Sequence, residues 1–328
     1  KSLDQKILRI KNNKYSPRDF IIADAKDGDL AMGITTPGPK RHKNGTIQKG
    51  YQKLLDYKNA MISMTQSKLV DIMLMSASVG EDLVKKNLFK HSPVTPAIRM
   101  NDTTDIWLMR YGNYTKTNPR PFRSAQMNKV CKLVNLGLFS VTFTNNVDYD
   151  LAMLNAYKEF RIEASKYKLN YFLEVFNSPI GLKMSVKEMG EYVNDCIIKA
   201  LAGQTKDERP LFLKIAYNGP KAMEELANFD PDNLIVGILG GPKGTTRDCF
   251  ELIKKASKYG AKVALFGRKI NLAEDPISIV KIMREIVENN IKPIDAVKLY
   301  HSELKKKNLI PDRKLSNDIK ITEQVLKL

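Results

Sequence analysis

The feature that most constrains the fold of this chain is a series of eight short apolar runs. The runs cover 19–28, 68–78, 92–101, 137–146, 170–177, 210–219, 233–242 and 261–269. Between many of them, as in 185–203 and 245–260, apolar residues recur every three or four positions, which is the period of a helix. Strands that alternate with helices predict a parallel sheet, and eight of them fit a closed (β/α)8 TIM barrel. A doubly wound open sheet is the alternative.

We expect one TIM-barrel domain over about residues 18–290 and a C-terminal helical extension over about 291–328. The segments 29–66 and 102–125 exceed ordinary connections between a strand and its helix, so we expect them to line or cover a site. No apolar run approaches the roughly 20 residues that span a bilayer. We therefore expect no membrane partner, and the three scattered cysteines favour a reducing cytoplasm.

The net charge of +18 raises the question of nucleic-acid binding. The lysines are spread along the chain and interleaved with acidic residues, and no aromatic and basic RNA-binding module occurs, so we do not expect a nucleic-acid partner. A positive field would instead attract a small anion such as a sugar phosphate. The three cysteines and three histidines show no spacing typical of a disulfide framework or a metal site, so we expect neither a metal nor another cofactor.

Two ionisable residues fall on equivalent faces of the fifth and sixth apolar runs. Lys214 alternates with Phe212 in "LFLKIAY", and Glu174 alternates with Phe172 in "YFLEVFN", while aliphatic residues occupy the opposite phase of each run. If the aliphatic face packs on the helices, both charged side chains point into the barrel. Either they form a structural ion pair, or a free amine on Lys214 attacks a carbonyl to form a Schiff base, with a nearby carboxyl group transferring protons.

Glycines follow the seventh and eighth apolar runs. Gly240 and Gly241 end "GILGG", and Gly267 and Arg268 end "VALFGR". Glycines at these points allow backbone N–H groups to approach an oxyanion, and barrels commonly hold phosphate after strands seven and eight. We therefore predict a phosphate site at these four residues, with Lys243 in "GGPKG" as a further candidate.

The stretch "LKIAYNG…VGILGGPKGTTRDCFELIKKASKYGAKVALFGRKI" resembles the archaeal-type class I fructose-bisphosphate aldolases and the related tagatose-bisphosphate and sulfofructose-phosphate aldolases. The resemblance extends over roughly 170–285. It implies that Lys214, within a Lys-x-x-Tyr pattern completed by Tyr217, is the Schiff-base residue. It also implies that the glycines after the last two strands bind the substrate phosphate.

The same resemblance suggests proton-transfer residues. "FLEVF" is similar to the tagatose-type fifth strand, which implies that Glu174 is the acid/base, and "IIADAKDG" favours Asp24, with Asp27 as the second choice. One departure concerns the fourth strand, where tagatose-type enzymes carry a second lysine and "LFSVTFTNN" has only hydroxyl side chains. Arg99, from the third run, is a candidate for the missing charge, and a structural arginine is the alternative.

The resemblance implies a metal-independent carbon–carbon lyase that forms a lysine Schiff base with a phosphorylated ketose or related sugar phosphate. It also implies a homo-oligomer. Two alternatives stay open on the sequence. One is thiolase-like acyl transfer on a phosphorylated diketone, and the other is a non-catalytic barrel that binds sugar phosphates or RNA.

Overall fold

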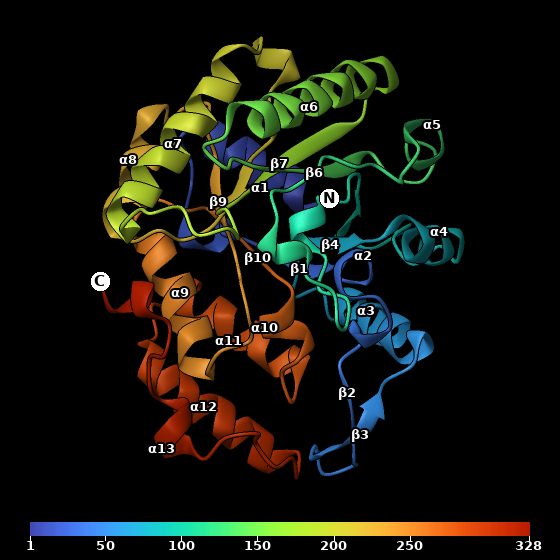
Figure 1. The fold of residues 1–328 in the computed structure, drawn as a ribbon. Coiled ribbons are helices and arrows are strands. Elements are labelled where there is room, and N and C mark those ends of the chain that lie inside the picture. The colour runs from blue at the N-terminus through green and yellow to red at the C-terminus, as the bar shows by residue number, and fades with distance from the viewer.

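The computed structural model describes residues 1–328 and contains a closed barrel of eight parallel strands (Figure 1). Each strand overlaps one of the eight predicted apolar runs, so the predicted (β/α)8 fold is confirmed. Around the barrel the order is β1-β10-β9-β8-β7-β6-β5-β4, and β4 pairs with β1 to close the ring. The strands are β1 (Ile21–Lys26), β4 (Ile72–Met75), β5 (Thr95–Arg99), β6 (Leu136–Thr142), β7 (Asn170–Phe176), β8 (Leu213–Ile215), β9 (Val236–Leu239) and β10 (Val263–Phe266).

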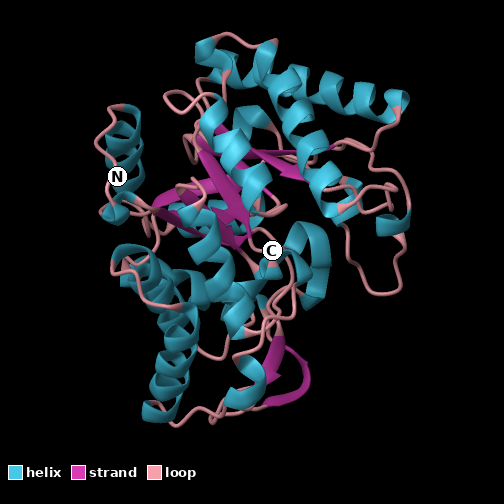
Figure 2. Cartoon of the chain, turned by 90° about the vertical axis from the view of Figure 1, so that its left-hand side faces the viewer, coloured by secondary structure: helices cyan, strands magenta, loops and turns pink.

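Helices surround the strands (Figure 2), and further helices follow the last strand toward the C-terminus. Short antiparallel strands β2 (Pro39–Arg41) and β3 (Ile47–Tyr51) form a hairpin in the long segment after β1. The helices are α1 (Ser2–Lys11), α2 (Asp29–Met32), α3 (Leu54–Ser67), α4 (Ala77–Lys85), α5 (Met127–Val130), α6 (Val147–Tyr167), α7 (Val186–Ala202), α8 (Pro220–Phe229), α9 (Thr246–Lys258), α10 (Arg268–Asn271), α11 (Pro276–Glu288), α12 (Pro293–Lys306) and α13 (Leu315–Asp318).

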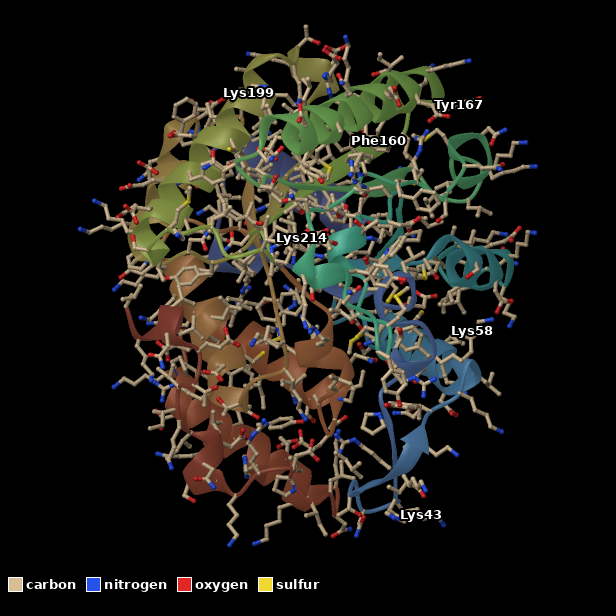
Figure 3. All side chains as sticks on the ribbon, viewed as in Figure 1. Lys43, Lys58, Phe160, Tyr167, Lys199 and Lys214 are labelled. Carbon is tan, nitrogen blue, oxygen red and sulfur yellow. The ribbon has the colours of Figure 1, made fainter.

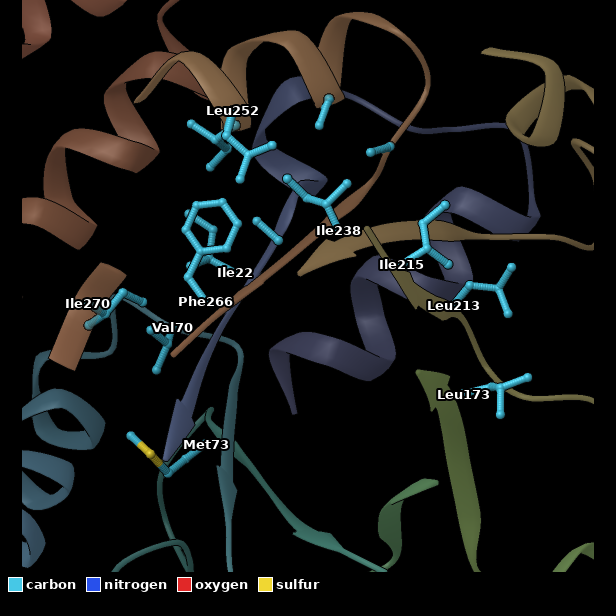
Figure 4. Packing of buried hydrophobic residues seen from close by; sticks show 14 of the residues in the cluster. Ile22, Val70, Met73, Leu173, Leu213, Ile215, Ile238, Leu252, Phe266 and Ile270 are labelled. Atoms are coloured by element: carbon cyan, nitrogen blue, oxygen red, sulfur yellow. The ribbon is translucent and has the colours of Figure 1, made fainter. Parts of the chain in front are cut away.

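Side-chain alternation along the strands separates two apolar layers. Leu213 and Ile215 belong to the larger cluster between the strands and the helices, where Figure 4 also shows Ile238 and Phe266 with Leu252 of α9. The residues of opposite phase fill a smaller cluster inside the barrel. The phase predicted for β7 and β8 is therefore confirmed.

The N-terminal helix α1 closes the end of the barrel opposite the carboxyl ends of the strands, which the sequence analysis did not predict. Its residues Leu3, Ile7 and Ile10 are buried and join the interior cluster with Ile21 and Val263, the first residues of β1 and β10. The helix thus excludes water from the amino-terminal end of the strands.

The C-terminal extension packs on α9 and on the loops that follow β9 and β10. Asp318 accepts a hydrogen bond from the backbone N–H of Thr246 at 2.9 Å, at the first turn of α9. The ammonium of Lys269, which is buried, lies 2.6 Å from Glu323. These contacts tie the extension to the two strand ends at which a phosphate site is predicted. No helix combines the length and apolar character needed to cross a membrane.

The role of α1 as a barrel plug is testable with two leucines of the same helix. Leu3 is 2% exposed and Leu8 is 60% exposed. We expect Leu3→Ala to lower the free energy of unfolding by about 2–4 kcal/mol, because it leaves a cavity in the interior cluster. Leu8→Ala should change it by less than about 0.5 kcal/mol. Urea unfolding measures both, and equal effects would show that α1 does not seal the barrel.

Candidate active site

A cavity of about 290 Å³ lies at the carboxyl ends of the strands, where barrel enzymes hold their catalytic groups. Figure 3 shows Lys214 near the middle of the molecule, whereas the labelled Lys43, Lys58 and Lys199 lie at its periphery. Most of the predicted site residues line this cavity, namely Asp27, Arg99, Glu174, Lys214, Gly240, Gly241, Gly267 and Arg268.

Lys214 and Glu174 are paired across neighbouring strands. They are register partners on β8 and β7, and the Lys214 Nζ atom lies 2.6 Å from Glu174 Oε1. Two residues earlier in each strand, and on the same inward face, the rings of Phe172 and Phe212 stack with their centroids 4.7 Å apart. The stacked rings provide an apolar floor, so the ammonium and the carboxylate meet at the base of the cavity with little water around them.

Arg99 connects this pair to the rest of the buried polar network. Its Nη1 atom donates to Asp27 Oδ2 at 2.8 Å and to Glu174 Oε2 at 3.2 Å, and its Nη2 atom donates to Ser140 Oγ at 2.8 Å. The Ser140 hydroxyl donates in turn to Glu174 Oε2 at 2.9 Å. Arg99 extends from β5 toward Ser140 on β6, which is the fourth strand of the barrel. It therefore supplies the positive charge that the fourth strand itself lacks.

Charge compensation explains the ionisation of this network. Burial raises the pKa of Asp27, but the positive charges of Arg99 and Lys214 outweigh it and hold that pKa below its usual value. Burial of Arg99 is similarly outweighed by Asp27 and Glu174, which raise the pKa of the guanidinium. Asp27 is thus held as a carboxylate directly beside the cavity.

The loops after β9 and β10 offer free donors to a ligand. The backbone N–H groups of Gly240, Gly241 and Gly267 donate to no acceptor within the protein. Gly241 has φ +66°, which favours glycine, and a Cβ atom on Gly267 would lie 3.0 Å from the carbonyl oxygen of Ala25. Arg268 lines the same end of the cavity, forms no ion pair, and has a pKa lowered by burial. This end of the cavity is therefore suited to an anion.

Asp24 does not reach the cavity, contrary to the sequence expectation. Alternation along β1 turns Ala23 and Ala25 into the barrel, so Asp24 points to the helix layer, where its carboxyl lies 3.0 Å from the Lys26 ammonium. Burial raises the pKa of Asp24 and Lys26 opposes that increase. The second choice, Asp27, is the aspartate of this segment that lines the cavity.

Tyr217 and Lys243 also lie outside the cavity. Tyr217 is buried in the outer cluster between the strands and the helices, where burial raises its pKa above the usual value. Lys243 forms an ion pair with Asp312 of the C-terminal extension at 2.6 Å, and Arg41 of the β2–β3 hairpin binds the same carboxylate at 2.7 Å. Lys243 therefore fastens the loop after β9 and is already neutralised.

A carboxyl group that no sequence pattern indicated lies in the long segment after β5. Asp105 lines the cavity, is 5% exposed, and has a buried Oδ1 atom without a hydrogen-bond partner. Burial raises its pKa to about 6, while Thr142 and Arg99 oppose that increase. Its neighbours Ile106 and Leu108 line the cavity as well, so the expectation that 102–125 borders the site is confirmed. Residues of 29–66, such as Met32, do so too.

The fold and the cavity define a (β/α)8 barrel with a lysine–glutamate pair at the base of its catalytic end. Among solved structures, a Schiff-base-forming fructose-1,6-bisphosphate aldolase superimposes with a TM-score of 0.63 and 15% identity over 87% of this chain and 99% of its own. An archaeal fructose-1,6-bisphosphate aldolase superimposes with a TM-score of 0.62 and 14% identity, over 88% of this chain and 99% of its own. A fructose-bisphosphate aldolase from Slackia heliotrinireducens superimposes with a TM-score of 0.63 and 10% identity, over 91% of this chain and 89% of its own.

In sequence, the chain is 25% identical over 239 residues to an uncharacterized aldolase of Saccharolobus solfataricus, which covers 70% of this chain and 81% of that protein. No protein-family model matches the chain. The resemblance to archaeal-type class I aldolases that the sequence predicted is therefore confirmed at the level of the fold.

The dependence of the buried network on Arg99 is testable through stability. We expect Arg99→Met to lower the free energy of unfolding by about 3–5 kcal/mol at neutral pH, because it leaves Asp27 and Glu174 without their shared cation. As a control, Lys85→Met breaks an exposed pair with Glu81 and should cost less than about 1 kcal/mol.

The dependence of this stability loss on pH follows from the direction of the Asp27 pKa shift. A carboxyl whose pKa is lower in the folded state stabilises the fold above its unfolded pKa, about 3.9 for Asp, and this contribution is lost as the pH falls through the folded value. The penalty of Arg99→Met should therefore shrink at acidic pH, where the Asp27 carboxyl that has lost its cation is protonated. Unfolding by guanidinium chloride at several pH values measures this penalty. A penalty independent of pH would contradict the conclusion that Arg99 holds Asp27 as a carboxylate.

Proposed function

We propose that the protein is a class I aldolase, in which Lys214 forms a Schiff base with a phosphorylated ketose or related sugar phosphate and a carbon–carbon bond is cleaved or formed. The observation that carries the proposal is the Lys214–Glu174 pair at the base of the cavity, beside unpaired backbone donors and an unpaired arginine. The likeness to a Schiff-base-forming fructose-1,6-bisphosphate aldolase and to an uncharacterized aldolase supports it.

The first step requires an unprotonated amine and an anchored carbonyl compound. Glu174 Oε1, 2.6 Å from Lys214 Nζ, can accept the ammonium proton. The free electron pair then attacks the substrate carbonyl, the resulting carbinolamine loses water, and an iminium bond joins Nζ to the substrate carbon. A phosphate held at Gly240, Gly241, Gly267 and Arg268 would orient that carbon toward Lys214.

Cleavage then uses the iminium as an electron sink. A carboxylate removes the proton from the hydroxyl on the second carbon from the iminium carbon. The bond between that carbon and the carbon adjacent to the iminium then breaks, its electron pair forms an enamine, and the hydroxyl-bearing carbon leaves as an aldehyde. Glu174 and Asp27 are the candidates for this transfer, because both carboxylates line the cavity and are held by Arg99. Protonation of the enamine and hydrolysis of the iminium release the second product.

Neither sequence-based alternative, thiolase-like acyl transfer nor a non-catalytic binding barrel, is favoured by a feature of the site. The metal-independent chemistry, the homo-oligomer and the cytoplasmic location stay predictions.

Borohydride trapping tests the Schiff base directly. With dihydroxyacetone phosphate and borohydride, we expect reduction of the iminium to a stable secondary amine, detected as a mass adduct on the peptide that contains Lys214. Lys214→Met should abolish the adduct, because only an amine can form the iminium. Lys199→Met removes an exposed lysine and should leave the adduct intact. An adduct that survives Lys214→Met would disprove the assignment.

The separate roles of Glu174 and Tyr217 are testable through proton exchange. An iminium makes the adjacent carbon-bound proton of dihydroxyacetone phosphate acidic, so turnover in D2O incorporates deuterium that NMR detects. We expect Glu174→Gln to slow this exchange by about 10²-fold or more, since a positioned general base is lost. Tyr217→Phe should leave the rate nearly unchanged, because Tyr217 lies outside the cavity. The opposite ranking of the two variants would restore the tyrosine as the proton-transfer residue.

A further inference from the structure

The cavity contains a single cation that no carboxylate neutralises. Three acidic and three basic residues line it, namely Asp27, Asp105, Glu174, Arg99, Lys214 and Arg268. Arg99 is paired with Asp27 and Glu174, and Lys214 is paired with Glu174. Only Arg268 is free, and burial alone lowers its pKa. An anion at the Arg268 end of the cavity would therefore meet a cation that has no other partner.

The opposite wall of the cavity carries no unpaired cation, because Arg99 at the end of β5 is already paired with Asp27 and Glu174. In the ring of eight strands, β5 lies four positions from β9, so the loops after these strands face each other across the barrel. The loop after β5 contributes Asp105 together with the apolar side chains of Ile106 and Leu108, and the neighbouring wall has Phe176 and Pro179. The backbone N–H of Leu108 donates to the carbonyl of Ala31 at 2.6 Å, which fixes this loop over the cavity.

Asp105 makes this wall unfavourable for a second phosphate. Asp105 is 5% exposed as a residue, and its Oδ1 atom has no hydrogen-bond donor. A phosphate group carries a charge of about −1.5 to −2 at neutral pH. Placing it beside a buried carboxyl group, where the nearby Arg99 is already paired with two carboxylates, costs free energy from both repulsion and lost hydration. A hydroxyl group meets no such penalty and can donate a hydrogen bond to the carboxylate.

We propose that the substrate carries one phosphate only. The phosphorylated fragment is the one that stays bound to Lys214, with its phosphate at Gly240, Gly241, Gly267 and Arg268, and the aldehyde fragment is unphosphorylated and lies against Asp105. This inference rests on the proposed Schiff-base function and adds its substrate class. Asp105 acts as the specificity-determining residue, because its carboxyl faces the part of the substrate that would carry a second phosphate.

Two ketose phosphates test the inference. Fructose 1-phosphate and fructose 1,6-bisphosphate both present a carbonyl to Lys214, and both are trapped by borohydride whether or not cleavage follows. We expect fructose 1-phosphate to reach half-maximal labelling of Lys214 at a concentration at least about tenfold lower, equivalent to about 1.4 kcal/mol. Equal labelling, or preference for the bisphosphate, would overturn the inference.

Dihydroxyacetone phosphate in parallel reactions separates this inference from the proposed function. If it labels Lys214 and fructose 1-phosphate does not, the substrate class is wrong and the Schiff-base function stands. If none of the three compounds labels Lys214, the proposed function itself fails.

A variant of Asp105 tests its role in selection. Asp105→Asn removes the negative charge and keeps the shape of the side chain, so we expect labelling by the bisphosphate to improve by about tenfold relative to the monophosphate. Asp105→Glu should restore the preference, and Asp195→Asn, at an exposed position of α7, should not change it. A loss of labelling by both ketoses to the same extent would show that Asp105 is structural and would overturn its role in specificity.

Discussion

The candidate site depends on one guanidinium group held below the surface of the barrel. Arg99 is 3% exposed and contacts Asp27, Glu174 and Ser140, which belong to three other parts of the ring. Two buried carboxylates on their own would take up protons or destabilise the barrel. With Arg99 between them, Asp27 is held as a carboxylate, and Glu174 is positioned against Lys214. The same interaction thus stabilises the fold and sets the ionisation of the site.

The rest of the architecture keeps this polar network at one end of the barrel. Stacked Phe172 and Phe212 separate it from an apolar interior, and α1 closes the far end. Water can therefore reach the network only through the cavity. On the open side, the C-terminal extension binds the loops after β9 and β10 through Asp312 and Glu323, so the unpaired donors at the anion-binding end are held by contacts far along the chain.

Errors of the sequence analysis have identifiable physical causes. "IIADAKDG" carries aspartates in both phases of the strand, so the pattern could not decide between Asp24 and Asp27 until the direction of the neighbouring alanines was known. Tyr217 follows a strand of three residues, and its odd spacing from Lys214 places it on the outer face. Asp105 lies in a segment without helical or strand periodicity, and only the return of that segment over the cavity reveals it.

The sequence by itself determined the eight strands, the inward phase of Lys214 and Glu174, and the glycines after the last two strands, because these follow from local periodicity and turn chemistry. Tertiary structure decided which charges meet. Asp27, Arg99 and Glu174 are separated by 72 and 75 residues in the chain, and local pattern says nothing about pairing over such distances. Closure of the barrel brings the ends of their strands together. Because an unpaired charge is costly to bury, the three side chains pair with one another there.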